Sequence, residues 1–176
     1  MIRTKISDIT LGTLFLTSGM LGISTPSQSY TPKQSHTSNY GRQIAQSAIN
    51  TATLEDAVFQ KINSYRASQN LPSLMRNSAI NTQARNHSQN MASGRVRFGH
   101  DGFIQRVQAT RLLYISAAEN VAFNQGYQDP AKKAVEGWLN SPGHLKNIKG
   151  QYNLTGIGVA SNSKGEVYFT QLFIRV

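Results

Sequence analysis

The sequence contains no cysteine among its 176 residues. Disulfide bonds and cysteine-ligated metal sites are therefore excluded. Small exported domains of eukaryotes often depend on disulfides, so export without cysteine is typical of a bacterial protein. A metal site would have to use histidine and carboxylate ligands, and the chain has only 4 His and 8 acidic residues to supply them.

Acidic residues are also scarce, because 8 Asp and Glu face 18 Lys and Arg and leave a net charge of +10. The basic residues are scattered, with Lys132-Lys133 as the only adjacent pair, and no basic run is interleaved with aromatic residues. This pattern argues against nucleic-acid binding. The charge could attract an anionic wall polymer or lipid head groups, or it could serve solubility alone.

The sequence has no apolar run of the length that a comfortable membrane span requires. The mostly apolar segment from Ile9 to Ile23 follows the basic residues Arg3 and Lys5, and small residues come after it. This order predicts a signal peptide over residues 1–29, with an uncleaved N-terminal anchor as the alternative. We expect a protein that is secreted, periplasmic or associated with the cell wall, and that does not span a membrane.

The next segment, residues 30–53, is rich in Ser, Thr, Gln, Asn and Pro, and it is predicted to be a disordered polar linker. The folded domain is predicted over residues 54–176. Thr53 and Asp56 have the spacing of a capping box at the start of the first helix.

Apolar residues at helical spacing predict a second helix from Ser78, with Ile80, Ala84, His87 and Met91 on its buried stripe. Asp129-Pro130 and Ser141-Pro142 each predict a further helix start. Strands are predicted over Glu119 to Phe123, Thr155 to Ser161 and Glu166 to Val176, the last two joined by a hairpin turn at residues 162–165. Helices first and strands last indicate an α+β fold with helices packed on an antiparallel sheet.

Three residues are candidates for a site because each lies in a segment whose backbone is tightly specified. His100 lies between Gly99 and the pair Asp101-Gly102, and His144 follows Ser141-Pro142-Gly143 at a predicted helix start. Glu119 lies in an otherwise apolar strand, where a buried carboxylate needs a partner. Two imidazoles and a carboxylate could bind a divalent metal or act in acid–base chemistry. The alternatives are surface histidines and a hydrogen-bonded core glutamate.

Other polar residues are assigned structural roles. His87 is interpreted as a core histidine, and Asn120 is expected to satisfy backbone groups of a loop. Ser141 is expected to cap the helix that begins at Pro142, which would occupy its hydroxyl. The chain has no Gly-x-Ser-x-Gly segment and no His-Glu-x-x-His segment, so neither a serine hydrolase elbow nor a metalloprotease helix is indicated.

The order of the motifs resembles the CAP superfamily, also called the SCP domain, in its cysteine-free bacterial form. The resemblance covers residues 54–176 and rests on Phe98-Gly99-His100, Ala118-Glu119-Asn120-Val121-Ala122, Trp138-Leu139-Asn140-Ser141-Pro142-Gly143-His144 and Gly156-Ile157-Gly158-Val159-Ala160.

The resemblance implies a three-layer α-β-α sandwich with a central antiparallel sheet and a cleft. It also implies that His100, Glu119 and His144 line that cleft and hold a divalent cation, often Zn²⁺, with Ser141 and Asn120 beside them. The sequence departs from the family where Ala118 replaces a glycine and Ser141 replaces a second acidic residue, so a four-residue metal site is incomplete.

Three functions remain open at the level of sequence. The first is an extracellular binding module whose cleft holds a metal, a lipid or sterol, or an anionic wall polymer. The second is a metal-dependent hydrolase in which His100 and His144 hold the metal and Glu119 acts as ligand or general base. The third is an interaction domain with a vestigial pocket.

Overall fold

The computed structural model describes residues 3–5 and 49–176 of the chain. Apart from residues 3–5, the predicted signal peptide lies outside the described residues, and so does the predicted linker up to residue 48. The elements, in chain order, are β1 (Arg3–Lys5), α1 (Thr51–Ser68), β2 (Met75–Arg76), α2 (Ser78–Ala92), α3 (Phe103–Ala109), β3 (Ser116–Gln125), α4 (Pro130–Leu139), α5 (Pro142–Lys149), β4 (Leu154–Ser161) and β5 (Glu166–Arg175).

The helices α1, α2 and α4 begin at residues whose side chains accept a hydrogen bond from the first turn. The first helix starts earlier than predicted, because Asn50 rather than Thr53 is its N-cap and accepts from the backbone N–H of Thr53. The predicted start at Asp129-Pro130 is confirmed: Asp129 accepts from the backbone N–H of Lys132 at 2.8 Å. Asn77 caps α2 in the same way.

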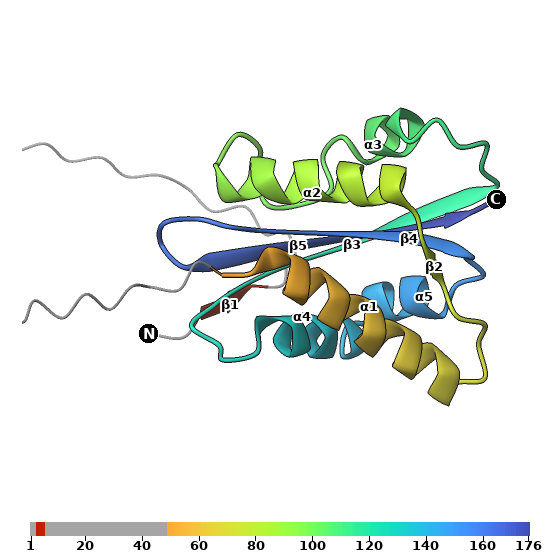
Figure 1. The fold of residues 1–176 in the computed structure, drawn as a ribbon, viewed down its shortest axis with the longest axis horizontal. Coiled ribbons are helices and arrows are strands. Elements are labelled where there is room, and N and C mark those ends of the chain that lie inside the picture. Colours follow the sequence, from red (N-terminus) through yellow and green to blue (C-terminus); the bar gives the residue numbers. More distant parts are fainter. Residues whose placement is uncertain (1–2, 6–48) are drawn as a thin grey trace, which may run out of the picture. The chain divides into compact units, whose positions relative to one another are not determined.

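The sheet has the strand order β1-β3-β5-β4-β2. The β4–β5 and β3–β5 pairs are antiparallel, as predicted, whereas the two-residue β2 runs parallel to β4. Helices α2 and α3 lie on one face, and α1, α4 and α5 lie on the other (Figure 1). The α+β, three-layer α-β-α architecture is therefore confirmed.

Glycines in β4 allow α2 to lie unusually close to the sheet. A Cβ atom at Gly158 would come within 2.1 Å of the backbone of Ala84 and Arg85, and one at Gly156 within 2.3 Å of the backbone of Ile80. No side chain fits in that space. Ser88 of α2 uses the proximity to donate a hydrogen bond to the carbonyl of Gly158 at 2.9 Å.

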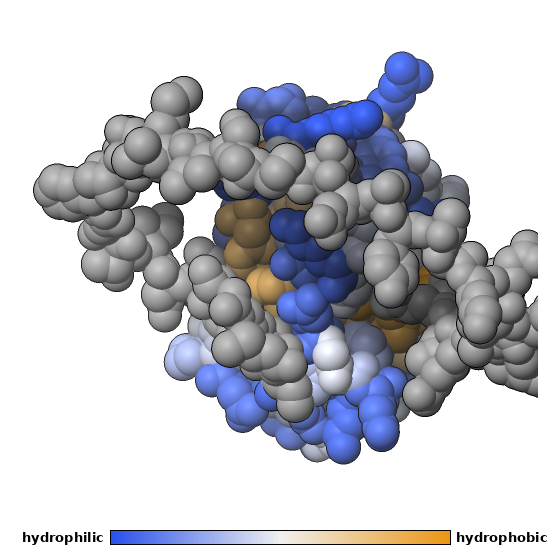
Figure 2. Space-filling view, turned by 90° about the vertical axis from the view of Figure 1, so that its left-hand side faces the viewer, coloured by the Kyte–Doolittle hydropathy of each residue, from blue (hydrophilic) through white to orange (hydrophobic). Residues whose placement is uncertain are grey.

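The core has a larger cluster on the α1–α4–α5 face and a smaller one on the α2–α3 face. Trp138 lies in the larger cluster and donates its indole N–H to the carbonyl of Val121 at 3.0 Å. The predicted stripe of α2 is buried, with Ile80 and Ala84 in the smaller cluster. In the view of Figure 2, hydrophobic residues show on both sides of a central hydrophilic group, and hydrophilic residues line the upper and lower borders. Among the described residues, no helix is long and apolar enough to cross a membrane.

Candidate functional site

One pocket gathers all three candidate residues. It has a volume of about 440 Å³ and is lined by His100, Glu119, Ser141, Pro142, Gly143, His144 and Asn147. Within the described part of the chain, β1 pairs only with residues 123–125 of β3, so residues 116–122 form an edge of the sheet. The pocket lies at this edge, because its lining residues come from elements on both faces of β3.

Glu119 is the buried charge of this site. Its side chain is only 2% exposed, and Arg106 of α3 binds both carboxylate oxygens, with Nη2 at 2.7 Å from Oε1 and Nε at 2.9 Å from Oε2. The imidazole Nδ1 of His100 lies 3.0 Å from Oε1 as well. The partner that a carboxylate in an apolar strand needs is thus an arginine in bidentate geometry, assisted by a histidine.

The loop that carries His100 is fixed by backbone geometry and by Arg106. Gly102 has φ +79° at the start of α3, a conformation that favours glycine. Arg106 also donates to the carbonyls of Asp101 at 2.6 Å and His100 at 3.3 Å. Glu119, rather than the neighbouring Asp101, therefore orients the His100 ring, whose side chain remains 52% exposed.

His87 supports the His100 loop from the protein core. As predicted, it is a buried core histidine, and its Nε2 lies 2.8 Å from the carbonyl of Gly99. Burial lowers the pKa of His87, and the positive charge of Arg106 lowers it further, against the opposing effects of the Gly99 carbonyl and Glu119. The neutral imidazole donates to Gly99 and holds the backbone next to His100.

The other wall of the pocket is the first turn of α5. Ser141 is its N-cap residue, but its hydroxyl makes no capping hydrogen bond and lies instead 2.8 Å from Nδ1 of His144. The expectation that the hydroxyl is used in capping is therefore wrong. Pro142 at the first helical position has no N–H, which leaves one fewer donor for a cap to satisfy.

Asn120 and Asn147 join the two walls. Asn120 donates to the carbonyl of His144 at 3.2 Å and accepts from Asn147 at 2.9 Å. Asn120 thus satisfies a backbone carbonyl of helix α5 rather than of a loop, and it is fully buried behind the pocket rather than lining it. Because neighbouring residues of a strand point to opposite faces, Glu119 holds the α3 side of the site while Asn120 holds α5.

The donor set does not fit a divalent metal. Arg106 binds both oxygens of Glu119 and His100 binds one of them, so the carboxylate charge that would attract a cation is already compensated. Across the described residues, no group of three or more histidine, cysteine or acidic side chains is arranged to hold a metal ion. The structure thus brings His100, Glu119 and His144 to one pocket without arranging them as a metal centre.

Sequence reasoning missed two members of the site, Arg106 and Asn147. Arg106 could have been found from the requirement that a buried carboxylate be neutralised, since it lies on the short helix directly after the His100 loop. Asn147 stands three residues after His144 and therefore on the same side of α5. Nothing local distinguishes either residue from an ordinary surface side chain.

Comparison with known proteins places this geometry in a family context. Residues 59–173 match the CAP model, the cysteine-rich secretory protein family. The chain is 32% identical over 125 residues to YkwD of Bacillus subtilis, a protein described as uncharacterized; the match covers 68% of this chain and 46% of YkwD. The chain thus spans less than half the length of that relative.

Two solved structures share the fold. An extracellular protein containing an SCP domain from Bacillus anthracis superposes with a TM-score of 0.59 at 30% identity, over 72% of this chain and 41% of that one. An outer surface protein from Borrelia burgdorferi gives a TM-score of 0.63 at 20% identity, over 72% of this chain and 96% of that one.

Proposed function

Because the chain belongs to the cysteine-rich secretory protein (CAP) family, we propose that it is an exported binding domain whose pocket between His100 and His144 holds an anionic group of an extracellular ligand. An exported location is supported by the extracellular and outer-surface origin of the two structural neighbours. The anionic group would be a phosphate or carboxylate, such as an acidic wall polymer carries.

The observation that carries this proposal is the neutralisation of Glu119 by Arg106. Among the described residues, Glu119 is the only acidic side chain that lines the pocket, and its charge is matched by the guanidinium. What remains is the exposed ring of His100, the ring of His144 and the positive end of the α5 dipole. An anion entering such a pocket meets the positive end of a helix and no uncompensated negative charge.

The metal-binding and hydrolase hypotheses receive less support from the same contacts. A metal would have to displace Arg106 from Glu119 and leave that nearly buried guanidinium without a charged partner, which is costly. A general base needs a carboxylate or imidazole that is free to accept a proton, and Glu119 is held by three hydrogen bonds. The mechanism that this pocket supports is therefore binding: Arg106 positions Glu119, Glu119 positions His100, and Asn120 positions α5.

The test is NMR titration of the full chain with inorganic phosphate and with acetate, following the ring signals of the histidines. We expect saturable shifts of His100 and His144, with apparent affinities in the millimolar range typical of a small anion at an open site. In the His100→Ala, His144→Ala variant, the same anions should no longer cause saturable shifts of the backbone amide signals of residues 141–147. His36→Ala, which lies in the predicted linker, is the matched control and should leave binding unchanged.

Zinc titration of the same proteins separates the competing hypothesis. Micromolar zinc binding that disappears in the His100→Ala, His144→Ala double variant, together with a flat phosphate titration, would overturn the anion proposal in favour of a metal site. Turnover of peptide or ester substrates that requires zinc and is lost in Glu119→Gln would favour the hydrolase.

A further inference from the structure

Large apolar side chains are exposed at one end of the sheet. The α3–β3 loop presents Leu113 (94% exposed), Ile115 (71%) and Tyr114 (40%), and Met75 and Val176 are exposed as well. We call these five residues the apolar end. Single exposed apolar residues are ordinary, but several large ones gathered at one end of a domain indicate an interaction surface.

Strand register places these residues together. Ile115 donates its backbone N–H to the carbonyl of Arg175, directly before Val176. Met75 pairs with Leu154, and Leu154 pairs with Ile174, one residue from Arg175. Figure 1 shows the α3–β3 loop curving around the end of the sheet beside the C-terminus.

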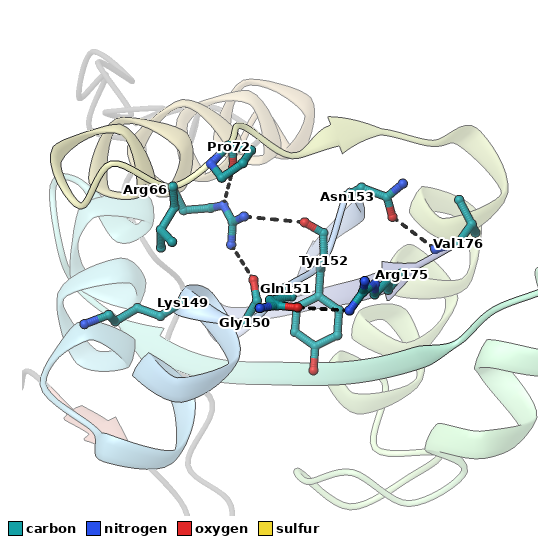
Figure 3. A pocket seen from close by; sticks show the side chains of 10 residues that line it. Arg66, Pro72, Lys149, Gly150, Gln151, Tyr152, Asn153, Arg175 and Val176 are labelled. Atoms are coloured by element: carbon teal, nitrogen blue, oxygen red, sulfur yellow. Dashed lines mark hydrogen bonds between the residues drawn. The ribbon is translucent and has the colours of Figure 1, made fainter.

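A second pocket opens at this end, and its charged side chains are all cationic. It has a volume of about 440 Å³, with walls formed by Leu71, Pro72, Tyr152 and Val176 and with Arg66, Lys149 and Arg175 around it (Figure 3). Within the described ranges, no acidic side chain lines it. Lys149 and Arg175 are accessible at its rim, and Arg111 precedes the exposed loop, so cations flank the apolar end.

Arg66 adds a buried positive charge whose partners in the structure are neutral. Its guanidinium donates to the backbone carbonyls of Pro72 at 2.9 Å, Ile148 at 2.7 Å and Gly150 at 2.9 Å. These acceptors satisfy its hydrogen bonds but carry no net charge, so its field reaches the pocket. The combination is a positive hollow next to projecting apolar side chains.

We propose that this end of the domain docks on an anionic phospholipid surface. Leu113, Tyr114 and Ile115 would enter the headgroup and acyl boundary, while Lys149, Arg175 and Arg111 would contact lipid phosphates. Apolar residues flanked by Lys and Arg form the usual pattern of peripheral membrane contact. The inference does not depend on the proposed function, because it concerns a different surface.

A membrane fits this surface better than a second copy of the chain. Two molecules of net charge +10 repel each other. A stable protein interface requires on the order of 20–30 residues on each side, and the apolar end offers five. A bilayer needs only a few inserted side chains and is complementary to the flanking cations.

The test is flotation of the full chain with vesicles of phosphatidylcholine, with and without phosphatidylglycerol. We expect binding to the anionic vesicles and at least about tenfold weaker binding to the neutral ones. Leu113→Ser with Ile115→Ser should weaken binding to anionic vesicles about tenfold or more. All variants keep the same N-terminal segment, so any lipid affinity of that segment cancels in the comparison.

Matched controls localise the contact. Lys149→Gln with Arg175→Gln should weaken vesicle binding about tenfold. Lys132→Gln with Lys133→Gln removes the same amount of charge from α4 and should change vesicle binding less than about twofold. On addition of anionic vesicles, the fluorescence of the tryptophan introduced by Leu113→Trp should shift to the blue and be quenched by brominated acyl chains. The tryptophan introduced by Ser163→Trp, in the hairpin at the opposite end of the sheet, should show neither effect.

Three results would overturn the proposal. The first is equal flotation of the wild type and the Leu113→Ser, Ile115→Ser variant. The second is equal binding to neutral and anionic vesicles. The third is a dimer in solution that the same double variant dissociates, because the apolar end would then be an interface between copies.

Discussion

A single ion pair sets the charge of the pocket. Glu119 alone would make the site negative and open to cations. With Arg106 in bidentate contact and His100 on the same oxygen, the carboxylate becomes a structural group that orients an imidazole. The side chains of the pair are 2% and 11% exposed, so solvent screens their attraction only weakly.

Removing the cation should therefore be costly. We expect Arg106→Met to lower the free energy of unfolding by about 3–5 kcal/mol, because it leaves the Glu119 carboxylate buried without a positive partner. Urea unfolding followed by circular dichroism measures the change. Arg97→Met, at an exposed position, is the control and should stay within about 0.5 kcal/mol. Equal stabilities of the two variants would contradict the ion pair as described.

The buried His87 predicts how stability depends on pH. Burial lowers its pKa in the folded state, so the unfolded chain takes up a proton at a higher pH than the folded one. The contribution of His87 to the free energy of unfolding should thus be fully present above the ordinary histidine pKa of about 6.5. It should be lost as the pH falls below that value. Urea midpoints between neutral and acidic pH measure this loss. His87→Gln keeps a donor for the Gly99 carbonyl and should flatten the curve, and an unchanged slope would exclude His87 as its source.

At the scale of elements, close contact between α2 and β4 fixes one half of the sandwich. The helix lies so near the strand that Gly156 and Gly158 have backbone atoms where a Cβ would be. Asn81 of α2 also accepts a hydrogen bond from the backbone N–H of Ile157 at 3.0 Å. This packing fixes the position of α2. Because His87 on α2 contacts the carbonyl of Gly99, it also fixes the loop that carries His100.

A methyl group at this contact should separate the two elements. We expect Gly158→Ala to destabilise the fold by about 3 kcal/mol, since the close atoms are backbone and cannot rotate away. Thermal unfolding of the variant and the wild type measures this loss of stability. Gly143→Ala is the matched control: a Cβ at Gly143 meets nothing within 4 Å, and the helical position should gain up to about 1 kcal/mol. If both substitutions were neutral, α2 and β4 would not be in the contact described.

Arg66 joins the end of α1 to the connection between α5 and β4. Its guanidinium satisfies carbonyls of residues 72, 148 and 150, and it lies 3.4 Å from the carbonyl of Tyr152. We expect Arg66→Met to cost about 3 kcal/mol in chemical unfolding, because these carbonyls lose their donor. Arg66→Lys should recover part of that loss. If Arg66→Met left the free energy of unfolding unchanged, water would be replacing the guanidinium as the donor to these carbonyls.

For the whole molecule, the excess of basic residues sets the range of partners. A net charge of +10 favours anionic surfaces at a distance. Both proposed ligands, a small anion at the His100 pocket and a phospholipid surface at the apolar end, are negatively charged. Their affinities should respond to salt in the same direction.

The electrostatic part of vesicle binding should be screened by salt. Raising NaCl from about 0.05 M to about 0.5 M shortens the Debye length severalfold, and we expect binding to anionic vesicles to weaken at least tenfold. Flotation at both salt concentrations measures this, with the fluorescence of buried Trp138 as a check that the fold is retained. Binding that is insensitive to salt would assign the attachment to the apolar side chains alone.

Local patterns in the sequence determined most of the elements and the family. Asp129-Pro130 began a helix, the stripe of α2 was buried, and the hairpin lay between β4 and β5, because caps, periodicity and turn residues act over a few positions. The family resemblance carried by those motifs implied that His100, Glu119 and His144 line one cleft, and they line one pocket. The start of α1 was misplaced because Asn50 and Thr53 both suit an N-cap, and only the folded chain shows which one is used.

Tertiary structure alone decided what those residues face. It paired Glu119 with Arg106, turned the Ser141 hydroxyl to His144 instead of the helix, and buried Asn120 behind the pocket. It also gathered Met75, Ile115 and Val176 at one end of the sheet, although they lie far apart in the chain. The physical reason is that a side chain's partner depends on elements brought together from distant parts of the sequence, and local periodicity carries no record of that choice.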